Sequence, residues 1–367
     1  MYAHTCNLLK HYSHTCPQPP VFAGGFSFLH RKESSMPQST IRISLPSKGR
    51  LAQDSLDFLE QAGLRVHKPN PRQYEASLPA LPGLKVLFQR PGDIVVSVRQ
   101  GSVEFGITGL DVVAEKGGDN GDILILHDAL GYGQCALTLA VPEAWEEVRS
   151  MHDLWARTQT LGRPLRVATK FPTLTGRFLQ QFAIPHTLIS AEGTLETAPT
   201  IGYADVISDL VSSGQTLRDN RLRPLDDGLI QSSQAALIAN RRALKHNPAA
   251  LEMARRLLEY IEAHLRAREN LLVIANVRGE SPEAVSQRIF TQRTIGGLQG
   301  PTIGRVYVRE EGQSWYSVNI VVRRADLPQA IAELRAIGGS GIIVTPVTYI
   351  FEEEPPRYTA MLAALED

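Results

Sequence analysis

Short apolar runs alternate with amphipathic stretches from residue 41 onward. Residues 41–45 and 85–89 have the composition of strands, and residues 51–62 have the apolar spacing of a helix that ends at Gly63. Residues 104–108 form another short strand. This β/α alternation predicts an α/β domain built on a mostly parallel sheet.

The same alternation starts again near residue 137. Residues 165–169, 187–190 and 205–210 are predicted strands, with a helix over 173–182. A further strand, 234–240, is expected to return the chain to the first unit. Two lobes linked by crossing strands create a cleft, which is a common place for a small ligand. We therefore assign residues 41–138 and 212–268 to lobe I, and residues 139–211 to lobe II.

The last third of the chain has a different rhythm. A long helix over residues 248–270 carries one apolar stripe. The order βαββαβ follows, which describes a small ferredoxin-like α+β domain over residues 269–355 with a tail at 356–367. Its predicted elements are 271–277, 281–290, 306–308, 317–322, 326–336 and 342–347.

Residues 1–40 have no periodic apolar pattern and lack the apolar core of a signal peptide. We expect a disordered or mis-annotated extension, with translation starting at Met36. His4-Thr5-Cys6 recurs as His14-Thr15-Cys16, so a zinc site is the alternative.

Charge and cysteine usage narrow the class of protein. Lys+Arg and Asp+Glu both number 38, so no general field attracts nucleic acid or an acidic membrane. No apolar run reaches the ~18 residues of a membrane span. The three cysteines, Cys6, Cys16 and Cys135, are too few for a disulfide framework, and Cys135 is expected to pack rather than act as a nucleophile. We expect a cytoplasmic protein.

The segment 204–217, ADVISDLVSSGQTL, is the feature most suggestive of chemistry. A buried strand delivers Asp205 and Asp209, and a loop of small hydroxyl residues follows. Small residues let backbone N–H groups approach a phosphate, and Gly214 permits a tight turn. Nearby acids could hold ribose hydroxyls or a magnesium ion on pyrophosphate. The alternative is an ordinary turn between a strand and a helix.

Several segments, in order, resemble the ATP phosphoribosyltransferase family. The segment 192–222, EGTLETAPTIGYADVISDLVSSGQTLRDNRL, resembles its signature region. GPTIGRV and AIGGSGIIVTP resemble the extra C-terminal domain of its long form. The other matching segments are LPSKGRL at 45–51, RPGDI at 90–94, VEFGITGLDVV at 103–113 and LRVATKFPTLTGRFL at 165–179.

This resemblance implies a fold, a reaction and partners. The two lobes would resemble the periplasmic-binding-protein-like fold, with an ACT-like C-terminal domain. N1 of ATP would displace pyrophosphate from phosphoribosyl pyrophosphate (PRPP), with Mg²⁺, in the first step of histidine biosynthesis. The long form implies inhibition by histidine and a homo-oligomer, dimer or hexamer, without a separate regulatory subunit. The strand 271–277, LLVIANV, departs from the family because it lacks an acid near the effector's amino group.

The resemblance also implies roles for individual residues. Asp205, Asp209, Lys48 and Arg50 would be catalytic, with a structural role for one of the two aspartates as the alternative. Glu196 would meet the metal. The 5-phosphate of PRPP would bind to Ser212, Ser213, Gly214, Gln215, Thr216 and Leu217. ATP would bind to Gly49, Arg90, Asp93, Thr108, Gly109, Tyr132 and Lys170. Histidine would bind near Thr302, Gly339, Ser340 and Gly341.

Three other functions remain open at this point. The chain could be a non-catalytic bilobal protein that binds a small molecule. It could be a phosphoribosyltransferase for another base, or a catalytically silent regulatory homologue. The intact loop at 205–217 counts against the last of these.

Overall fold

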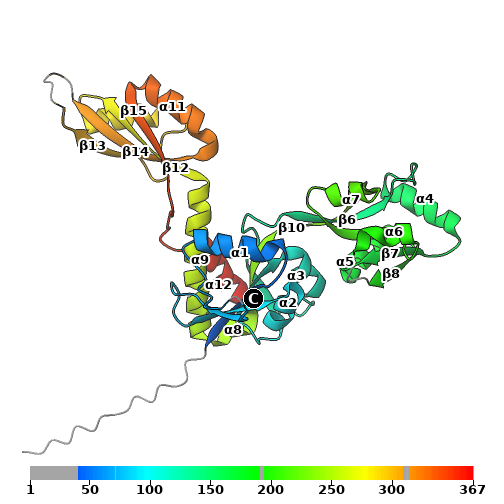
Figure 1. Cartoon of the computed structure of the whole chain (residues 1–367). Coiled ribbons are helices and arrows are strands. Elements are labelled where there is room, and N and C mark those ends of the chain that lie inside the picture. Colours follow the sequence, from blue (N-terminus) through cyan, green and yellow to red (C-terminus); the bar gives the residue numbers. More distant parts are fainter. Residues whose placement is uncertain (1–39, 71, 191–193, 309–311, 313, 367) are drawn as a thin grey trace, which may run out of the picture. The chain divides into compact units, whose positions relative to one another are not determined.

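The computed structural model describes residues 40–366, apart from residues 71, 191–193, 309–311 and 313. The N-terminal extension, with Met36 and both His/Cys repeats, lies outside the described residues. The described residues contain three sheets, which define two lobes and a smaller domain (Figure 1).

Lobe I is built on a six-stranded mixed sheet. Strand β1 pairs in parallel with β3 on one side and β4 on the other, so the carboxyl ends of these three strands lie at one edge of the sheet. The strand order is β2 (Glu75–Ser77), β3 (Leu84–Gln89), β1 (Ile41–Pro46), β4 (Phe105–Gly109), β11 (Ala235–Asn240) and β5 (Ile123–His127). Its helices are α1 (Arg50–Gln61), α2 (Pro91–Arg99), α3 (Leu110–Lys116), α8 (Arg241–His246) and α9 (Pro248–Arg268).

The core of lobe I joins this sheet to the long helix α9. Ile43 and Phe105 are fully buried, and they share one cluster with Leu257 and Ile261 of α9. The apolar stripe predicted for this helix is confirmed. Its burial is the main reason that so long a helix is stable here.

Lobe II is built on a five-stranded mixed sheet, in which β7 pairs in parallel with β8 and β9. The strand order is β10 (Leu222–Ser233), β6 (Cys135–Pro142), β9 (Val206–Val211), β7 (Leu165–Thr169) and β8 (His186–Ser190). Its helices are α4 (Met151–Leu161), α5 (Pro172–Gln181), η1 (Leu195–Thr197), α6 (Ala198–Ile201) and α7 (Gln215–Asp219).

The lobe boundaries differ from those predicted. Strand β10 runs antiparallel to β6, from Leu222 beside Pro142 to Ser233 beside Cys135. Residues 135–138 and 212–233, which the sequence placed in lobe I, therefore belong to lobe II, where Leu217 of α7 packs with Ile207 and Leu222. The irregular alternation of buried and exposed positions along β10 concealed this strand from sequence analysis.

The chain passes between the lobes twice. It leaves lobe I through residues 128–134, between β5 and β6, and returns through Gln234, between β10 and β11. A backbone hydrogen bond ties the first passage to the start of β11, directly after the second passage, because the Ala235 N–H donates to Tyr132 O at 3.0 Å. We call these two segments the lobe crossing.

The smaller domain has the predicted βαββαβ order. Its antiparallel sheet runs β13 (Thr302–Val306), β14 (Trp315–Arg323), β12 (Asn270–Arg278) and β15 (Gly339–Pro346). Helices α10 (Pro282–Phe290) and α11 (Leu327–Ala336) follow β12 and β14, with η2 (Arg324–Asp326) between β14 and α11. This strand order is that of a ferredoxin-like domain, so the predicted fold class is confirmed.

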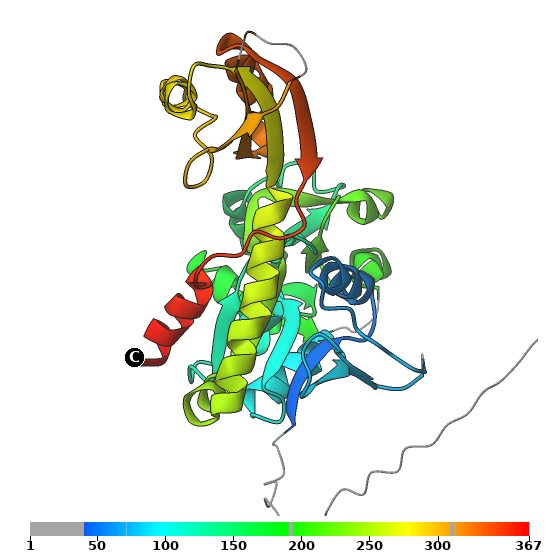
Figure 2. The same cartoon turned by 90° about the vertical axis from the view of Figure 1, so that its left-hand side faces the viewer.

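The C-terminal segment is not a free tail. Helix α12 (Pro356–Glu366) buries Met361, which is 3% exposed, in the core of lobe I. Arg241 of α8 donates to Ala364 O at 2.6 Å. Figure 2 shows this C-terminal segment passing over α9 on its way from β15. Among the described helices, none has the length and apolar character required to cross a bilayer.

Candidate active site

The polar residues predicted in lobe I gather at one edge of its sheet. Lys48, Gly49 and Arg50 follow β1, Arg90 follows β3, and Gly109 ends β4. Because these three strands are parallel neighbours, their carboxyl ends form one surface, which is where open α/β sheets bind ligands. The fold thus brings these predicted residues together at one face.

The cations at this edge are accessible to a ligand. Lys48, Arg50 and Arg90 are exposed, and within the described residues only Arg50 has an acidic partner, Asp54, at 3.4 Å. Asp93 is exposed in the first turn of α2. Free guanidinium and ammonium groups at a strand edge suit the phosphates of a nucleotide.

Thr108 and Gly109 are buried rather than presented to solvent. The Thr108 hydroxyl donates to Pro91 O at 3.4 Å. A Cβ at Gly109 would lie 2.2 Å from Asp111 Oδ1, so this close approach requires glycine. Only the backbone of this pair is therefore suited to meeting a ligand.

Asp111 is a buried acid that the sequence analysis did not single out. The Ser233 hydroxyl donates to its carboxylate at 2.5 Å, and the Asp111 N–H donates to Ser233 Oγ at 3.0 Å. Burial raises the pKa of Asp111 although the bond from Ser233 opposes the rise. The pair fixes the start of α3 against the end of β10, at the lobe crossing. Its only sequence signal was the acid inside VEFGITGLDVV.

The loop after β9 has the features expected of a phosphate site. Ser212 and Ser213 are exposed, and Gly214 has a φ of 71°, in the left-handed region that favours glycine. The Gln215 N–H and the hydroxyl of Ser213 lie 3.4 Å apart in this turn. Thr216 is exposed, whereas Leu217 is buried and anchors α7.

Arg218 supplies positive charge to this loop, and the sequence analysis missed it. Its guanidinium donates to Ser213 O at 3.2 Å and to Gln215 Oε1 at 3.0 Å. Its Nη1 lies 3.1 Å from the position that a Cβ at Gly214 would take. A serine-rich turn with a guanidinium beside it is well suited to a phosphate.

Asp209 lies near this loop with two other charged residues. Burial raises the pKa of its carboxyl, the Lys170 charge lowers it, and the Glu196 charge raises it. Lys170 follows β7, and β7 pairs with β9 so that Thr169 is beside Ser208. Asp209, Lys170 and Glu196 therefore form one mixed-charge group in lobe II.

Asp205 lies at the other end of the same strand. Arg163 and Arg166 donate to its carboxylate at 2.6 and 2.8 Å. Burial alone would raise the pKa of Asp205, but these hydrogen bonds hold it well below its usual range. The six residues of β9 separate Asp205 from the loop by about 20 Å at ~3.3 Å per residue. The geometry therefore favours a structural role over the predicted catalytic one.

Tyr132 is also placed differently from the prediction that it stacks on adenine. Its ring packs against Phe58 with 5.2 Å between centroids, and its hydroxyl donates to Ser55 Oγ at 3.0 Å. Burial raises the pKa of this phenol. The side chain belongs to the core of lobe I beside the lobe crossing.

A pocket of about 400 Å³ lies beside Ser212 at the lobe crossing. Leu110 lines it from lobe I, Ser212 from lobe II, and Gln234 and Cys135 from the crossing and its border. Burial raises the pKa of the Cys135 thiol, which keeps it protonated at neutral pH.

The predicted regulatory residues do not meet within one chain. Thr302 begins β13 at one edge of the small sheet, while Gly339, Ser340 and Gly341 begin β15 at the other edge. Two strands lie between them, so they are about 14 Å apart at ~4.8 Å per strand.

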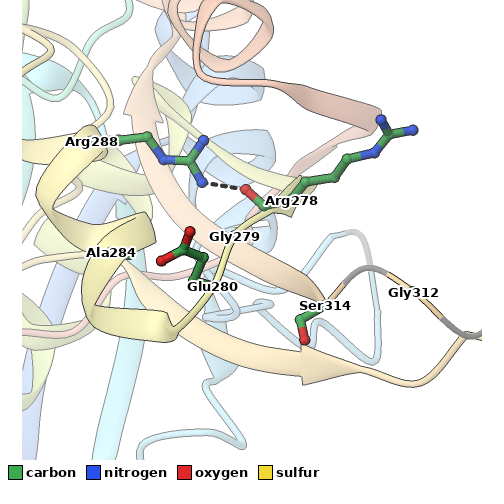
Figure 3. Close-up of a pocket in the computed structure, with 7 residues that line it drawn as sticks. All are labelled: Arg278, Gly279, Glu280, Ala284, Arg288, Gly312 and Ser314. Carbon is green, nitrogen blue, oxygen red and sulfur yellow. Dashed lines mark hydrogen bonds between the residues drawn. The ribbon is translucent and has the colours of Figure 1, made fainter.

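A pocket of about 670 Å³ lies at the end of β12. Glu280 and Arg288 line it, and Figure 3 shows their charged groups on the same side, with the Arg278 side chain directed away. Arg278 instead stacks on Trp315, with its guanidinium carbon 4.6 Å from the ring centroid. Glu280 is an acid just beyond β12, whereas residues 271–277 contain none.

Among the described residues, no group of three or more His, Cys, Asp or Glu side chains is arranged to hold a metal ion. Mg²⁺ bound to a pyrophosphate needs only one or two protein carboxylates, because phosphate oxygens and water complete its shell. Asp209 and Glu196 fit that requirement, because the Glu196 charge is near enough to raise the pKa of Asp209.

Comparison with known families decides between the reaction that the resemblance implies and the three alternative functions. Residues 90–263 match the family described as ATP phosphoribosyltransferase, and residues 267–349 match its C-terminal domain, described as HisG, C-terminal domain. ATP phosphoribosyltransferase 2, chloroplastic, of Arabidopsis thaliana is 47% identical over 89% of this chain and 80% of its own length. The chain belongs to the ATP phosphoribosyltransferase family. It is of the long form, and it catalyses the first step of histidine biosynthesis by transferring phosphoribosyl from PRPP to ATP.

Two further similarities accompany this result. ATP phosphoribosyltransferase 1, chloroplastic, of the same plant is 44% identical over 89% of this chain and 81% of its own length. Among solved structures, the periplasmic aliphatic sulphonate binding protein SsuA of Escherichia coli is 14% identical. Its TM-score is 0.38, with 62% of this chain and 74% of that one covered.

The expected cytoplasmic location is wrong. Both plant relatives are chloroplastic enzymes by name. The expectation rested on the small number of cysteines, which indicates a reducing compartment but does not distinguish cytoplasm from chloroplast.

Proposed function

We propose that lobe II of this ATP phosphoribosyltransferase binds PRPP and that the sheet edge of lobe I binds ATP. The observation that carries the proposal is the loop after β9, where Ser212, Ser213 and Gly214 form a turn beside the Arg218 guanidinium. The exposed cations Lys48 and Arg90, at the carboxyl ends of the lobe I strands, would then bind the ATP phosphates.

The transfer forms a bond from N1 of adenine to C1 of the ribose and breaks the bond from C1 to pyrophosphate. Positive charge develops on the ribose as negative charge develops on the leaving group, so positioning and electrostatics suffice without a covalent nucleophile. In this proposal Asp209 stabilises the charge on the ribose, and Lys170 stabilises the charge on the pyrophosphate. Asp209 and Glu196 would hold Mg²⁺, which would supply further positive charge to the leaving group.

Separate loss of affinity for each substrate tests this division. Arg218→Ala should raise the KM for PRPP about tenfold and leave the KM for ATP unchanged, because one charge-assisted contact is worth about 1.5 kcal/mol. Arg90→Ala should do the reverse. Arg177→Ala, an exposed arginine on α5 paired with Asp119 at 3.6 Å, is the control and should change neither. If Arg218→Ala weakened ATP alone, the assignment of the lobes would be reversed.

We also propose that histidine inhibits this chain through the small domain and that the enzyme is a homo-oligomer. Thr302 and Gly341 lie at opposite sheet edges, so a site using both requires two copies. Glu280 offers the acid for the amino group of the effector, and Arg288 stands beside it in the pocket.

The test is inhibition of the full chain by histidine. Glu280→Gln should raise the concentration for half inhibition about tenfold, since a charged hydrogen bond would be lost. Glu283→Gln, an exposed residue on α10 outside the pocket, should leave it unchanged. Equal inhibition of both variants would exclude Glu280. Deleting residues 271–367 is unsuitable, because Met361 is part of the lobe I core.

We propose further that the chain works in a chloroplast, as its two plant relatives do. Residues 1–39 contain a single acid, Glu33, and several serines, a composition typical of transit peptides. Import assays with isolated chloroplasts test this, and exclusion of the full chain from the organelle would contradict it.

A further inference from the structure

The segment after β15 connects the small domain to lobe I a second time. The first connection is the direct continuation of α9 into β12. The second runs along α9: the Ile350 N–H donates to Ala263 O at 3.1 Å, and Arg266 pairs with Glu352 at 2.5 Å. Aromatic contacts add to it, with the rings of Tyr260 and Tyr349 6.3 Å apart.

Arg357, in the first turn of α12, links this segment to the lobe crossing. Its guanidinium lies 2.7 Å from Asp128, the first residue after β5. Its backbone N–H donates to Glu262 of α9 at 3.2 Å, and its guanidinium lies 3.8 Å from the same carboxylate. One side chain therefore joins the C-terminal helix, helix α9 and the start of the crossing.

The local electrostatics make Arg357 hard to replace. The Glu262 side chain is 12% exposed, and its Oε2 is buried without a hydrogen-bond partner in the part of the chain that the structure describes. Burial raises the pKa of Glu262, and the Arg357 charge opposes the rise. Arg357 thus stabilises the desolvated Glu262 carboxylate, together with Arg266, and also pairs with Asp128.

The crossing itself rests on α9 beside this contact. A pocket of about 610 Å³ is lined by Ala129, Gly131 and Gln234 of the crossing and by Glu262 and Arg266 of α9. Movement between the lobes must change the backbone of these crossing residues, because among the described residues no other stretch of backbone runs between the two sheets. The ion pair between Arg357 and Asp128 therefore constrains the first residue of the lobe crossing.

We propose that Arg357 is a positioning residue for the transfer reaction: through Asp128, α12 sets the conformation of the lobe crossing. The substrates occupy different lobes under the proposed division, so the crossing determines how well the two reacting groups align. The last 18 residues of the chain, beyond the matched C-terminal domain at residue 349, are then part of the catalytic unit.

The experiment uses the full chain without histidine, so its outcome is independent of the proposed inhibition. Arg357→Ala should lower kcat about three- to tenfold, with much smaller changes in both KM values, since coupling of this kind is worth about 0.5–2 kcal/mol. Arg357→Lys should restore most of the rate. Asp128→Asn should reproduce the loss, and the double variant should be no slower than either single variant.

The control is Arg255→Ala. Arg255 lies on α9 and pairs only with Glu252 and Glu259 of the same helix among the described acids, so kcat should not change. Circular dichroism at the assay temperature confirms that each variant is folded. A lower melting temperature of Arg357→Ala with an unchanged kcat would overturn the proposal and leave α12 a purely structural element. Additive losses in the double variant would also overturn it.

Discussion

Replacing Gly214 by aspartate is expected to raise the KM for PRPP by about a hundredfold or more, with little change in the KM for ATP. The new carboxylate would stand where the 5-phosphate is proposed to bind. Two negative groups in direct contact repel each other strongly. The new carboxylate would also pair with Arg218, whose Nη1 is 3.1 Å from the added Cβ. Repulsion of the phosphate and loss of the Arg218 contact together should weaken PRPP binding by about 3 kcal/mol.

Backbone strain must be separated from this effect, because Gly214 has a φ of 71°. Gly202 provides the control: its φ is 86°, it lies in the same lobe, and nothing is within 4 Å of an added Cβ. Gly202→Asp should carry a similar strain without affecting PRPP. Gly214→Ala should show the strain at the site itself, without the charge. Titration calorimetry with PRPP gives the affinity directly, and undiminished binding by Gly214→Asp would rule out this loop as the phosphate site.

The second large effect is expected at Asp209. Asp209→Asn should lower kcat about a hundredfold, because removing an electrostatic group aimed at developing charge typically costs 2.7–4 kcal/mol, or about 10²–10³ in rate. The melting temperature should hold or rise, since the pKa of Asp209 is raised by burial and ionisation of this carboxyl costs stability at neutral pH.

Asp205→Asn is the matched comparison on the same strand. It should leave the kcat of the folded enzyme unchanged and destabilise the fold by about 1–3 kcal/mol, because charge-assisted bonds from Arg163 and Arg166 are weakened. The pKa of Asp205 is held below its unfolded value, so its contribution is present at neutral pH. It is lost as the pH falls below about 4. Melting curves from pH 7 to 3 measure this difference. If Asp205→Asn instead abolished the activity of a folded enzyme, the roles of the two acids would be reversed.

Much of this fold was predictable because the sequence signals were local. Strand 165–169, the return strand 234–240 and the long helix from Pro248 all occur as expected. The βαββαβ order of the small domain came from short-range periodicity. In each case the pattern of apolar residues corresponds to one buried face.

The differences arose where pairing is non-local. Strand β10 depends on β6, which is about 90 residues earlier, and its own sequence alternates too irregularly to show it. Helix α12 was taken for a tail because the surface that covers Met361 belongs to a distant lobe. Pairing register and docking of this kind leave little trace in one sequence.

The candidate site likewise contains features that local sequence shows and features that depend on distant residues. The loop at 212–217 was predictable from its own composition, as were the residues that follow β1 and β3. The distinction between Asp205 and Asp209 was not, since it depends on Arg163 and Arg166 lying at one end of the strand and Lys170 at the other. Arg218 and Glu280 were missed because their proposed roles depend on the residues around them in the fold and not on their spacing in the sequence.

The most direct test of the account is the reaction itself. Purified full chain is mixed with PRPP, Mg²⁺, a pyrophosphatase and either ATP or another purine or pyrimidine base, and the absorbance of the product is followed. We predict phosphoribosyl-ATP with ATP and no product with the other bases. Product with another base, and none with ATP, would contradict the account.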